Sequence, residues 1–235
     1  MLEIKNVDKS YGTKKALENI SITVDNGSVF GFIGANGAGK TTLIKAIVGI
    51  HNIDSGEITL NNKSINDAIA YKKDIAYVPD NPDIYPNLKG IEYLNFICDI
   101  YEIGKDERLN LIEKYAKDFE IYNNLEDIIS SYSHGMKQKL VLISALIHKP
   151  KLLVLDEPFV GLDPKSTKIL KDIIKELKSS GVIIFLSSHV LEVVEKICDH
   201  IGIIKNGKLI AIGETNKIKG KEDLENIFLE LTSEE

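Results

Sequence analysis

A glycine-rich segment between two apolar stretches constrains the fold of this chain more than any other feature. Residues 34–41 have the sequence GANGAGKT and fit the pattern GxxxxGK[ST]. The nearly continuous apolar run before them, residues 29–33, is typical of a buried parallel strand, and a helical pattern follows over residues 40–49. This strand–loop–helix context is what the pattern requires in order to bind phosphate. The segment therefore predicts an α/β fold built around a phosphate-binding loop.

The residue types of this glycine-rich loop suit the phosphates of a nucleotide. Glycines allow the backbone to turn its N–H groups inward, and the helix that follows contributes its positive end. Lys40 is expected to reach the β- and γ-phosphates, and the hydroxyl of Thr41 is expected to ligate Mg²⁺. The predicted binding residues of the loop are Gly34, Asn36, Gly37, Ala38, Gly39, Lys40, Thr41 and Thr42.

An acidic motif follows a second apolar strand pattern. Residues 151–158, KLLVLDEP, place Asp156 and Glu157 at the carboxyl end of a buried parallel strand, where open α/β sheets bind ligands. Asp156 is expected to hold Mg²⁺, directly or through water. Glu157 is expected to polarise the water that attacks the γ-phosphate, in the role of a general base.

The rest of the chain alternates strand and helix patterns, which favours a mainly parallel sheet. Residues 2–7 and 20–24 have the pattern of strands with one wet face, as at an antiparallel edge. Residues 86–149 contain apolar positions at helical spacing, so we expect an inserted helical subdomain there. Further strands are predicted at 75–78, 152–155, 182–186, 201–205 and 208–212, and further helices at 165–177 and around Leu224, Ile227, Phe228 and Leu231.

Several further segments resemble the motifs of ATP-binding-cassette (ABC) proteins, in the order of that family. Residues 131–138, SYSHGMKQ, resemble the signature motif, whose usual form is LSGGQ. Residues 161–164, GLDP, resemble the D-loop, and residues 187–189, SSH, resemble the segment of the switch histidine. Tyr11, just before Gly12, matches the aromatic residue that stacks on adenine in this family.

This resemblance covers residues 2–212 and implies a nucleotide, a fold and residue roles. ATP is the implied nucleotide, with Tyr11 against its adenine and Ser133 and Gly135 against its γ-phosphate. Glu157 and His189 are the implied catalytic residues. The implied fold class is α/β, with a P-loop NTPase (RecA-like) core, a mainly parallel sheet, an antiparallel β subdomain and an inserted α-helical subdomain.

Two departures from the usual family pattern bear on the site. The signature keeps Ser133 and Gly135 but differs at three other positions, which hold Tyr132, His134 and Met136. Asp80, an implied Mg²⁺ ligand, stands where the family usually has glutamine, and an ionised carboxylate cannot donate the hydrogen bond of an amide. Both departures resemble the branch that serves ABC-2-type exporters.

The expected function is that of an ATP-binding and ATP-hydrolysing subunit of an ABC transporter, with an exporter favoured. No apolar run approaches the roughly 18 residues of a spanning helix, so separate integral-membrane permease subunits are implied. They are expected to dock near Asp80 and at exposed apolar residues of the early helical subdomain, with Ile84, Tyr85 and Leu88 as candidates, and the chain is expected to be peripheral at the cytoplasmic face of the cell membrane. A second ATP-binding subunit is implied, in a head-to-tail homodimer or heterodimer.

Composition limits the other classes of function. The net charge of −6 argues against a nucleic-acid partner, and Cys98 and Cys198 form no CxxC pair, which favours a reducing cytosol. A soluble ABC ATPase with a non-transport role remains the alternative, and an ATP-holding module without turnover is a third class. The expected divisions are a core with the antiparallel part at 1–85, the helical subdomain at 86–149, the rest of the core at 150–212 and an amphipathic tail at 213–235.

Overall fold

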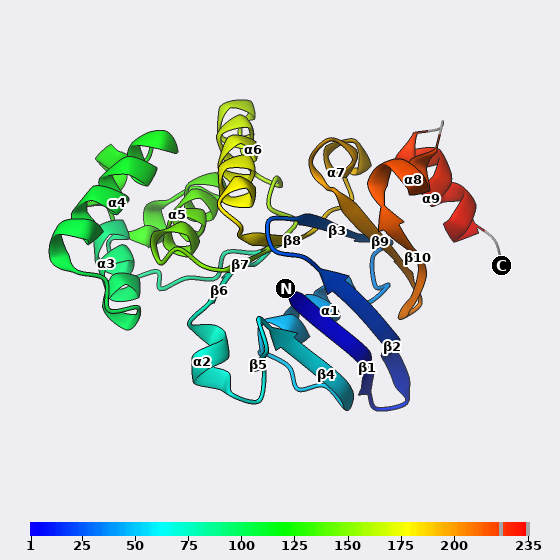
Figure 1. Ribbon diagram of the computed structural model, residues 1–235. Coiled ribbons are helices and arrows are strands. Elements are labelled where there is room, and N and C mark those ends of the chain that lie inside the picture. Colours follow the sequence, from blue (N-terminus) through cyan, green and yellow to red (C-terminus); the bar gives the residue numbers. More distant parts are fainter. Residues whose placement is uncertain (221–222, 234–235) are drawn as a thin grey trace.

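The computed structural model describes residues 1–220 and 223–233, and its centre is a six-stranded sheet (Figure 1). Neighbouring strands are parallel except at one edge, where the last strand forms a hairpin. In the order in which they lie side by side, the strands are β10 (Lys208–Glu214), β9 (His200–Lys205), β3 (Val29–Gly34), β8 (Ile183–Ser187), β7 (Leu152–Asp156) and β6 (Ile75–Val78).

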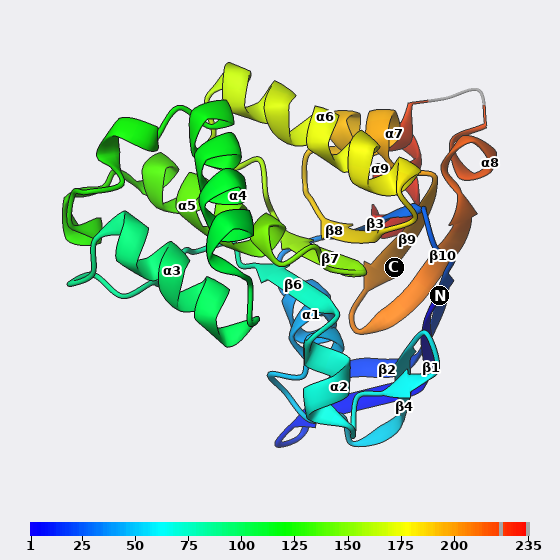
Figure 2. The ribbon, with the colours of Figure 1, turned by 60° about the vertical axis from the view of Figure 1, so that its left-hand side comes forward.

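Both faces of this sheet are covered, which explains the apolar runs in its strands. In β7 the side chains alternate between two hydrophobic cores: Leu153 and Leu155 belong to one, Leu152 and Val154 to the other. Figures 1 and 2 show helices on the two faces of the sheet. One face carries α6 (Pro164–Ser179) and α7 (Leu191–Ile197), and the other carries α1 (Lys40–Ile47).

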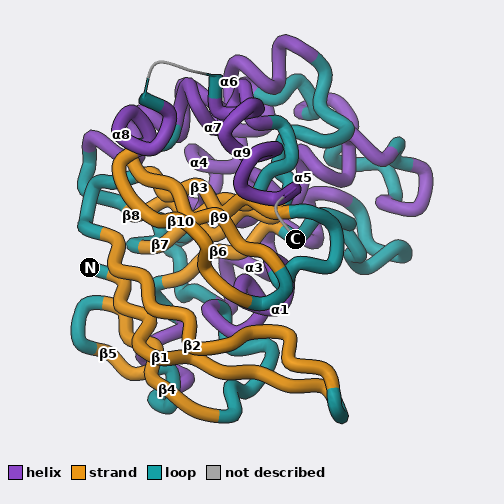
Figure 3. The backbone as a smooth tube through the Cα atoms, turned by 90° about the vertical axis from the view of Figure 1, so that its right-hand side faces the viewer, coloured by secondary structure: helices purple, strands orange, loops and turns teal. Residues whose placement is uncertain are grey.

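A smaller antiparallel sheet lies beneath α1, as a separate layer in Figure 3. Its strands bury every second residue over much of their length, and the buried residues share the core of α1. The two predicted strands, at 2–7 and 20–24, are longer than the sequence predicted, and the other two strands of this sheet were not predicted. In order across the sheet they are β2 (Lys14–Val24), β1 (Leu2–Tyr11), β4 (Ser55–Leu60) and β5 (Lys63–Ser64).

The segment between residues 86 and 149 is helical, as its apolar spacing predicted. It contains α3 (Gly90–Ile100), α4 (Lys105–Asp118), η1 (Tyr122–Asn124), η2 (Ile129–Ser131) and α5 (His134–Ile147). The remaining helices are α2 (Ala68–Lys72), α8 (Thr215–Lys219) and α9 (Leu224–Ser233). The α/β fold class with parallel and antiparallel sheets is confirmed, whereas the division at 85, 149 and 212 stays a prediction. Residues 221–222 and 234–235 of the predicted tail lie outside the described residues.

Strand order brings the predicted motifs together. Because β3, β8 and β7 are parallel neighbours, their carboxyl ends meet at one edge of the sheet. The glycine-rich loop follows β3, the acidic motif ends β7, and the switch-histidine segment follows β8. This edge is where an open α/β sheet binds its ligand.

Candidate functional site

The glycine-rich loop, residues 34–41, runs from β3 directly into α1. Gly37 and Gly39 have φ angles of +80° and +118°, and a Cβ atom on Gly39 would lie 2.6 Å from the carbonyl oxygen of Ala16. Only glycine therefore fits at residue 39. Lys40 is 7% exposed, and its Nζ donates hydrogen bonds to the carbonyl oxygens of Gly34 (2.6 Å) and Ala35 (3.2 Å). Its ammonium group is thus held at the loop that the sequence identified.

A cavity of about 330 Å³, here called the loop cavity, opens over this segment. It brings together the loop, the end of β1 and both carboxylates of the acidic motif. Gly34 faces a second cavity, and Ala38 is buried, with its N–H donating to the carbonyl oxygen of Ala35 at 3.1 Å. The residues that line the loop cavity are Tyr11, Lys14, Ala16, Asn36, Gly37, Gly39, Lys40, Thr41, Thr42, Asp80, Asp156 and Glu157.

Asp156, the last residue of β7, is 3% exposed at the floor of the loop cavity. Its Oδ1 accepts a hydrogen bond of 2.5 Å from the Ser187 hydroxyl, and Thr41 is a further hydrogen-bond partner. Burial raises the pKa of Asp156, and the nearby carboxylate of Asp80 raises it further. Burial and the charge of Asp80 thus disfavour the ionised carboxylate of Asp156, and a bound cation would stabilise it.

The oxygen atoms at this point fit Mg²⁺, which prefers carboxylate, hydroxyl and phosphate ligands. Thr41 and Asp156 are in contact, and Asp80 lines the same cavity. Within the described part of the chain, no three His, Cys, Asp or Glu side chains form a cluster that could hold a metal by themselves. Oxygen donors of this kind suit an ion that shares its coordination with the phosphates of a nucleotide, as Mg²⁺ commonly does.

Glu157 and His189 are in direct contact. Glu157 has a left-handed backbone, with φ +48°, and its Oε2 lies 2.9 Å from His189 Nδ1. The same oxygen accepts a hydrogen bond of 3.2 Å from the backbone N–H of His189. A carboxylate held in this way beside the phosphate loop has the geometry of a general base next to an orienting group.

A second cavity of about 480 Å³, here called the histidine cavity, adjoins the first and shares Asn36, Asp80 and Glu157 with it. One side is polar, with Ser188 and His189. The other side is apolar and includes residues that the sequence analysis did not assign to the site. These are Val160, Leu191 and Phe228, and the corresponding additions in the loop cavity are Lys14 and Ala16. The spacing of the tail predicted an amphipathic helix with Phe228 on its apolar side, but it did not predict what that side contacts.

Tyr11 lies where the adenine-stacking residue was predicted, at the end of β1 and on the wall of the loop cavity. The side chain is 47% exposed, so the ring is available to a planar ligand. Lys9 Nζ lies 5.6 Å from its centroid, and the ring of His51 meets it edge-on at 6.0 Å. These two neighbours hold the ring at the cavity mouth.

The predicted signature residues lie elsewhere, at the start of α5. The Ser133 hydroxyl caps this helix by accepting a hydrogen bond of 3.3 Å from the N–H of Met136. A Cβ on Gly135 would lie 2.7 Å from the carbonyl oxygen of Gly161, so the signature packs tightly on the D-loop of its own chain. Among the described residues that line the loop and histidine cavities, neither Ser133 nor Gly135 occurs.

Two further contacts tie the signature region together. Lys139 Nζ lies 2.8 Å from the carboxylate of Asp163, and this hydrogen bond holds the pKa of Asp163 well below its usual range. Tyr132, where the usual signature has leucine, is buried and donates a hydrogen bond of 2.6 Å to the carbonyl oxygen of Asn124. Burial raises the pKa of Tyr132 to about 12. The departure at residue 132 therefore fills the core of the helical segment.

The apolar residues predicted to be exposed near Asp80 differ from one another. Tyr85 is 56% exposed and meets Phe96 edge-on, with ring centroids 5.9 Å apart. Ile84 and Leu88, in contrast, are partly buried against the core, so the prediction that they are exposed was wrong. Their side chains complete the packing of the helical segment, which leaves Tyr85 and Phe96 as the outward pair.

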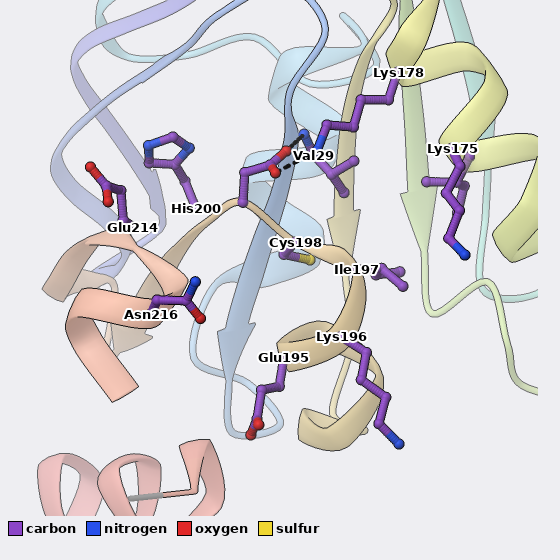
Figure 4. Close-up of a pocket in the computed structure, with 12 residues that line it drawn as sticks. Val29, Lys175, Lys178, Glu195, Lys196, Ile197, Cys198, His200, Glu214 and Asn216 are labelled. Atoms are coloured by element: carbon purple, nitrogen blue, oxygen red, sulfur yellow. Dashed lines mark hydrogen bonds and ion pairs between the residues drawn. The ribbon is translucent and has the colours of Figure 1, made fainter. Parts of the chain in front are cut away.

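A third cavity, of about 640 Å³, lies away from the glycine-rich loop, between α6, α7 and β9 (Figure 4). Asp199, one of its lining residues, accepts a hydrogen bond from the N–H of Val29 at 2.9 Å and pairs with Lys178 at 2.5 Å. Glu195 pairs with Lys219 and accepts from the N–H of Leu224. The two carboxylates are thus each paired with a lysine. Their hydrogen bonds and ion pairs connect β3 with α6, and α7 with the tail. Cys198, in the same wall, is buried as a free thiol, as is Cys98.

The parallel sheet, the glycine-rich loop after β3 and the acidic end of β7 define a class of protein, the P-loop NTPases. Comparison with known proteins then gives the family. Residues 17–160 match the family model described as ABC transporter. The chain belongs to the ABC transporter family and is similar throughout to its ATP-binding subunits.

Its relatives cover nearly the whole chain. The ABC-type transporter ATP-binding protein EcsA of Bacillus subtilis (strain 168) is 32% identical over 241 residues, which cover 100% of this chain and 98% of EcsA. The linearmycin resistance ATP-binding protein LnrL of the same organism is 38% identical over 214 residues, 91% of this chain and 69% of LnrL. A solved ATP binding subunit of an ABC transporter has a TM-score of 0.94 and 32% identity, with 98% of this chain and 99% of that chain covered.

Proposed function

We propose that this chain binds and hydrolyses Mg²⁺-ATP and thereby drives an ABC transporter of the ABC-2 exporter type. The observation that carries the proposal is the convergence of Lys40, Asp156, Glu157 and His189 on two adjoining cavities at one sheet edge. Each of these groups supplies one requirement of phosphoryl transfer: charge for the phosphates, a metal ligand, a base and an orienting partner.

The hydrolytic step needs a proton acceptor beside the attacking water. Glu157 Oε2, fixed by two contacts with His189, is the candidate acceptor. Thr41 and Asp156 would hold Mg²⁺, with Asp80 at the next position on the cavity wall; the ion neutralises phosphate charge when bound. Lys40 and the N–H groups of the glycine-rich loop bind the phosphates, and Tyr11 stacks on adenine.

A head-to-tail dimer of ATP-binding subunits is part of the proposal. Ser133, which is exposed, and Gly135, which is half-buried, lie at the start of α5, apart from the cavities lined by Lys40 and Glu157. A second subunit would bring its own Ser133 and Gly135 to the γ-phosphate. The proposal gives each ATP one glycine-rich loop and the signature of the other subunit.

Transport requires partners in the membrane. Among residues 1–220 and 223–233, no helix combines the length and the apolar character needed to cross a bilayer. We place the chain at the cytoplasmic face of the cell membrane, bound to integral-membrane permease subunits near Asp80 and Tyr85. Two departures from the usual family pattern support export: Asp80 in place of glutamine, and a signature of the form Tyr-Ser-x-Gly-Met at residues 132–136. The name of the relative LnrL, a linearmycin resistance protein, also supports it.

Purification from native membranes tests the proposal. The tagged chain should retain an integral-membrane subunit and hydrolyse ATP only with Mg²⁺, whereas Lys40→Ala should retain the same subunit without hydrolysis, because its change lies in the cavity. Hydrolysis without any membrane subunit would favour the alternative, a soluble ABC ATPase with a non-transport role. Binding of ATP without turnover in either preparation would favour a regulatory module.

A further inference from the structure

We infer that Ser187 is a positioning residue for both carboxylates of the site: through its hydroxyl it orients Asp156 toward Mg²⁺ and fixes the turn that carries Glu157. This inference rests on the proposed function. Ser187 is the last residue of β8, two residues before His189, and its side chain lies inside the fold rather than in the loop cavity or the histidine cavity. Its own hydrogen bonds assign it a second task.

The hydroxyl of Ser187 uses both its donor and its acceptor capacity on the acidic motif. It donates to Asp156 Oδ1 at 2.5 Å and accepts from the backbone N–H of Glu157 at 3.2 Å. The same N–H lies 3.3 Å from the carbonyl oxygen of Ser187. The parallel register sets Ser187 directly beside Asp156, so these contacts follow from the pairing of β8 with β7.

The donated hydrogen bond fixes Oδ1 of Asp156 and thereby sets the direction of the second oxygen, Oδ2, which is proposed to ligate the metal. Because a carboxylate has two oxygens, a hydroxyl that holds Oδ1 restricts rotation about the terminal bond of Asp156. A buried ligand whose orientation is set before the metal arrives binds it more tightly. Thr41 contacts Asp156 from the side of α1, so the two hydroxyls approach the carboxylate from different elements.

The accepted hydrogen bond acts on Glu157. This residue has φ +48°, a conformation that a residue with a side chain adopts only when its surroundings enforce it. A bond from its N–H to Ser187 helps to enforce the turn that directs the Glu157 carboxylate to His189. Loss of the hydroxyl would therefore loosen the base as well as the metal ligand.

Packing alone does not call for a hydroxyl at this position. The four preceding residues of β8 are apolar and fully buried, and Ser187 is itself 0% exposed. Valine would suit a buried strand better than serine, and an unpaired hydroxyl there would be costly. The hydroxyl is tolerated because its hydrogen bonds to Asp156 and Glu157 satisfy it, and both residues belong to the proposed site.

A pair of variants with equal shape tests the inference. Ser187→Thr and Ser187→Val have nearly the same shape, and valine carries a methyl group where threonine keeps the hydroxyl. ATP affinity is measured for each in EDTA and in Mg²⁺, and kcat is measured with Mg²⁺-ATP. Ser144→Ala, which removes a buried serine hydroxyl within α5, controls for the general effect of such a loss.

Affinity for ATP in EDTA should be the same in the Thr and Val variants. The gain in affinity on adding Mg²⁺ should be smaller in the Val variant, and kcat should fall by about 10-fold to 100-fold relative to the Thr variant. If the Val variant does not fold, Ser187→Ala, which adds no methyl group, should show the same two losses against Ser144→Ala.

Provided that the wild-type chain is active in the same experiment, two results would overturn the inference. One is an equal Mg²⁺ gain and an equal kcat in the Thr and Val variants. The other is a loss of ATP affinity in EDTA that matches the loss in Mg²⁺, because that would indicate general damage to the site. A wild-type chain that neither gains affinity from Mg²⁺ nor hydrolyses ATP would instead overturn the proposed function.

Discussion

The two parts of the proposed ATP site are built in different ways. Around the glycine-rich loop, residues from four separate segments converge at one edge of the parallel sheet, where Lys40 and Asp156 are buried. Around the signature, Ser133 is exposed at the start of one helix, and Gly135 is half-buried where that helix packs against the D-loop at Gly161. The first part gathers the groups that the proposed function assigns to the phosphates and the metal. In the described part of the chain, the residues of the second part line neither cavity, which is the arrangement that the proposed head-to-tail dimer requires.

The largest expected effect concerns the first part. Glu157→Gln should keep ATP binding and lower hydrolysis by roughly 10²-fold to 10⁴-fold, because an amide cannot accept the proton of the attacking water. Steady-state phosphate release and a separate ATP-binding titration measure the two quantities. With hydrolysis blocked, the ATP-bound dimer should accumulate in size-exclusion chromatography. Turnover at the wild-type rate would remove Glu157 from the role of base.

The next experiment mixes two inactive variants to test whether the loop part and the signature part of one ATP site come from different subunits. Lys40→Ala damages the loop part, and Ser133→Arg places a bulky cation at the signature part. Each homodimer has two defective sites and should be nearly inactive. After subunit exchange, about half of the dimers are mixed, and each of these joins one intact loop to one intact signature. Phosphate release should therefore recover to a measurable fraction of the wild-type rate.

The result of the mixing experiment distinguishes two arrangements. If a single chain built its complete site, no combination of the two variants would contain an intact one, and activity would stay absent. Subunit exchange has to be shown independently, for example by energy transfer between differently labelled chains. Exchange without recovery would count against the shared site or against turnover by a single intact site.

A smaller effect is expected at the mouth of the loop cavity. Tyr11→Ala should weaken ATP binding by about one to two decades, since stacking of a base on an aromatic ring contributes roughly 1–3 kcal/mol. Tyr11→Phe keeps the ring and should change the affinity little. The measurement is a titration with ATP in EDTA, which separates stacking from metal binding. Equal losses in both variants would assign the effect to the hydroxyl.

The smallest effect concerns the far end of α5, which is anchored on the core rather than exposed. His148 stacks on Tyr101, with ring centroids 3.8 Å apart, and its Nε2 lies 3.0 Å from the carbonyl oxygen of Ile75. Burial lowers the pKa of His148 below its ordinary value of 6.5. The unfolded chain therefore binds a proton at His148 more readily than the folded protein does. The stabilising contribution of neutral His148 is complete at pH values above 6.5, and it is lost as the pH falls below that value.

Unfolding in urea at several pH values checks this prediction against His148→Phe, which keeps a ring but does not titrate. The free energy of unfolding of the wild type should fall relative to that of the variant between about pH 8 and pH 5. A difference that does not change with pH would mean that the ring of His148 acts through packing alone.

The strands of the two sheets were predictable to different degrees. The strands β3, β7 and β8 are buried on both faces, so their apolar runs predicted their positions to within one or two residues. The strands β1 and β2 extend past their alternating parts into exposed residues, and the first half of β4 is exposed. These residues are held by hydrogen bonds to neighbouring strands, which leave no hydrophobic pattern in the sequence.

The phosphate-binding loop and the acidic motif can be read from the chain alone, because each is formed by residues that follow one another directly: a strand, a turn and a helix in one case, a strand and its carboxylates in the other. Which other residues meet them depends on how the chain folds. Ser187 contacts Asp156, and Phe228 reaches the cavity of His189, because strands and helices distant in the chain become neighbours. Such contacts depend on strand order and register, which no spacing along the sequence specifies.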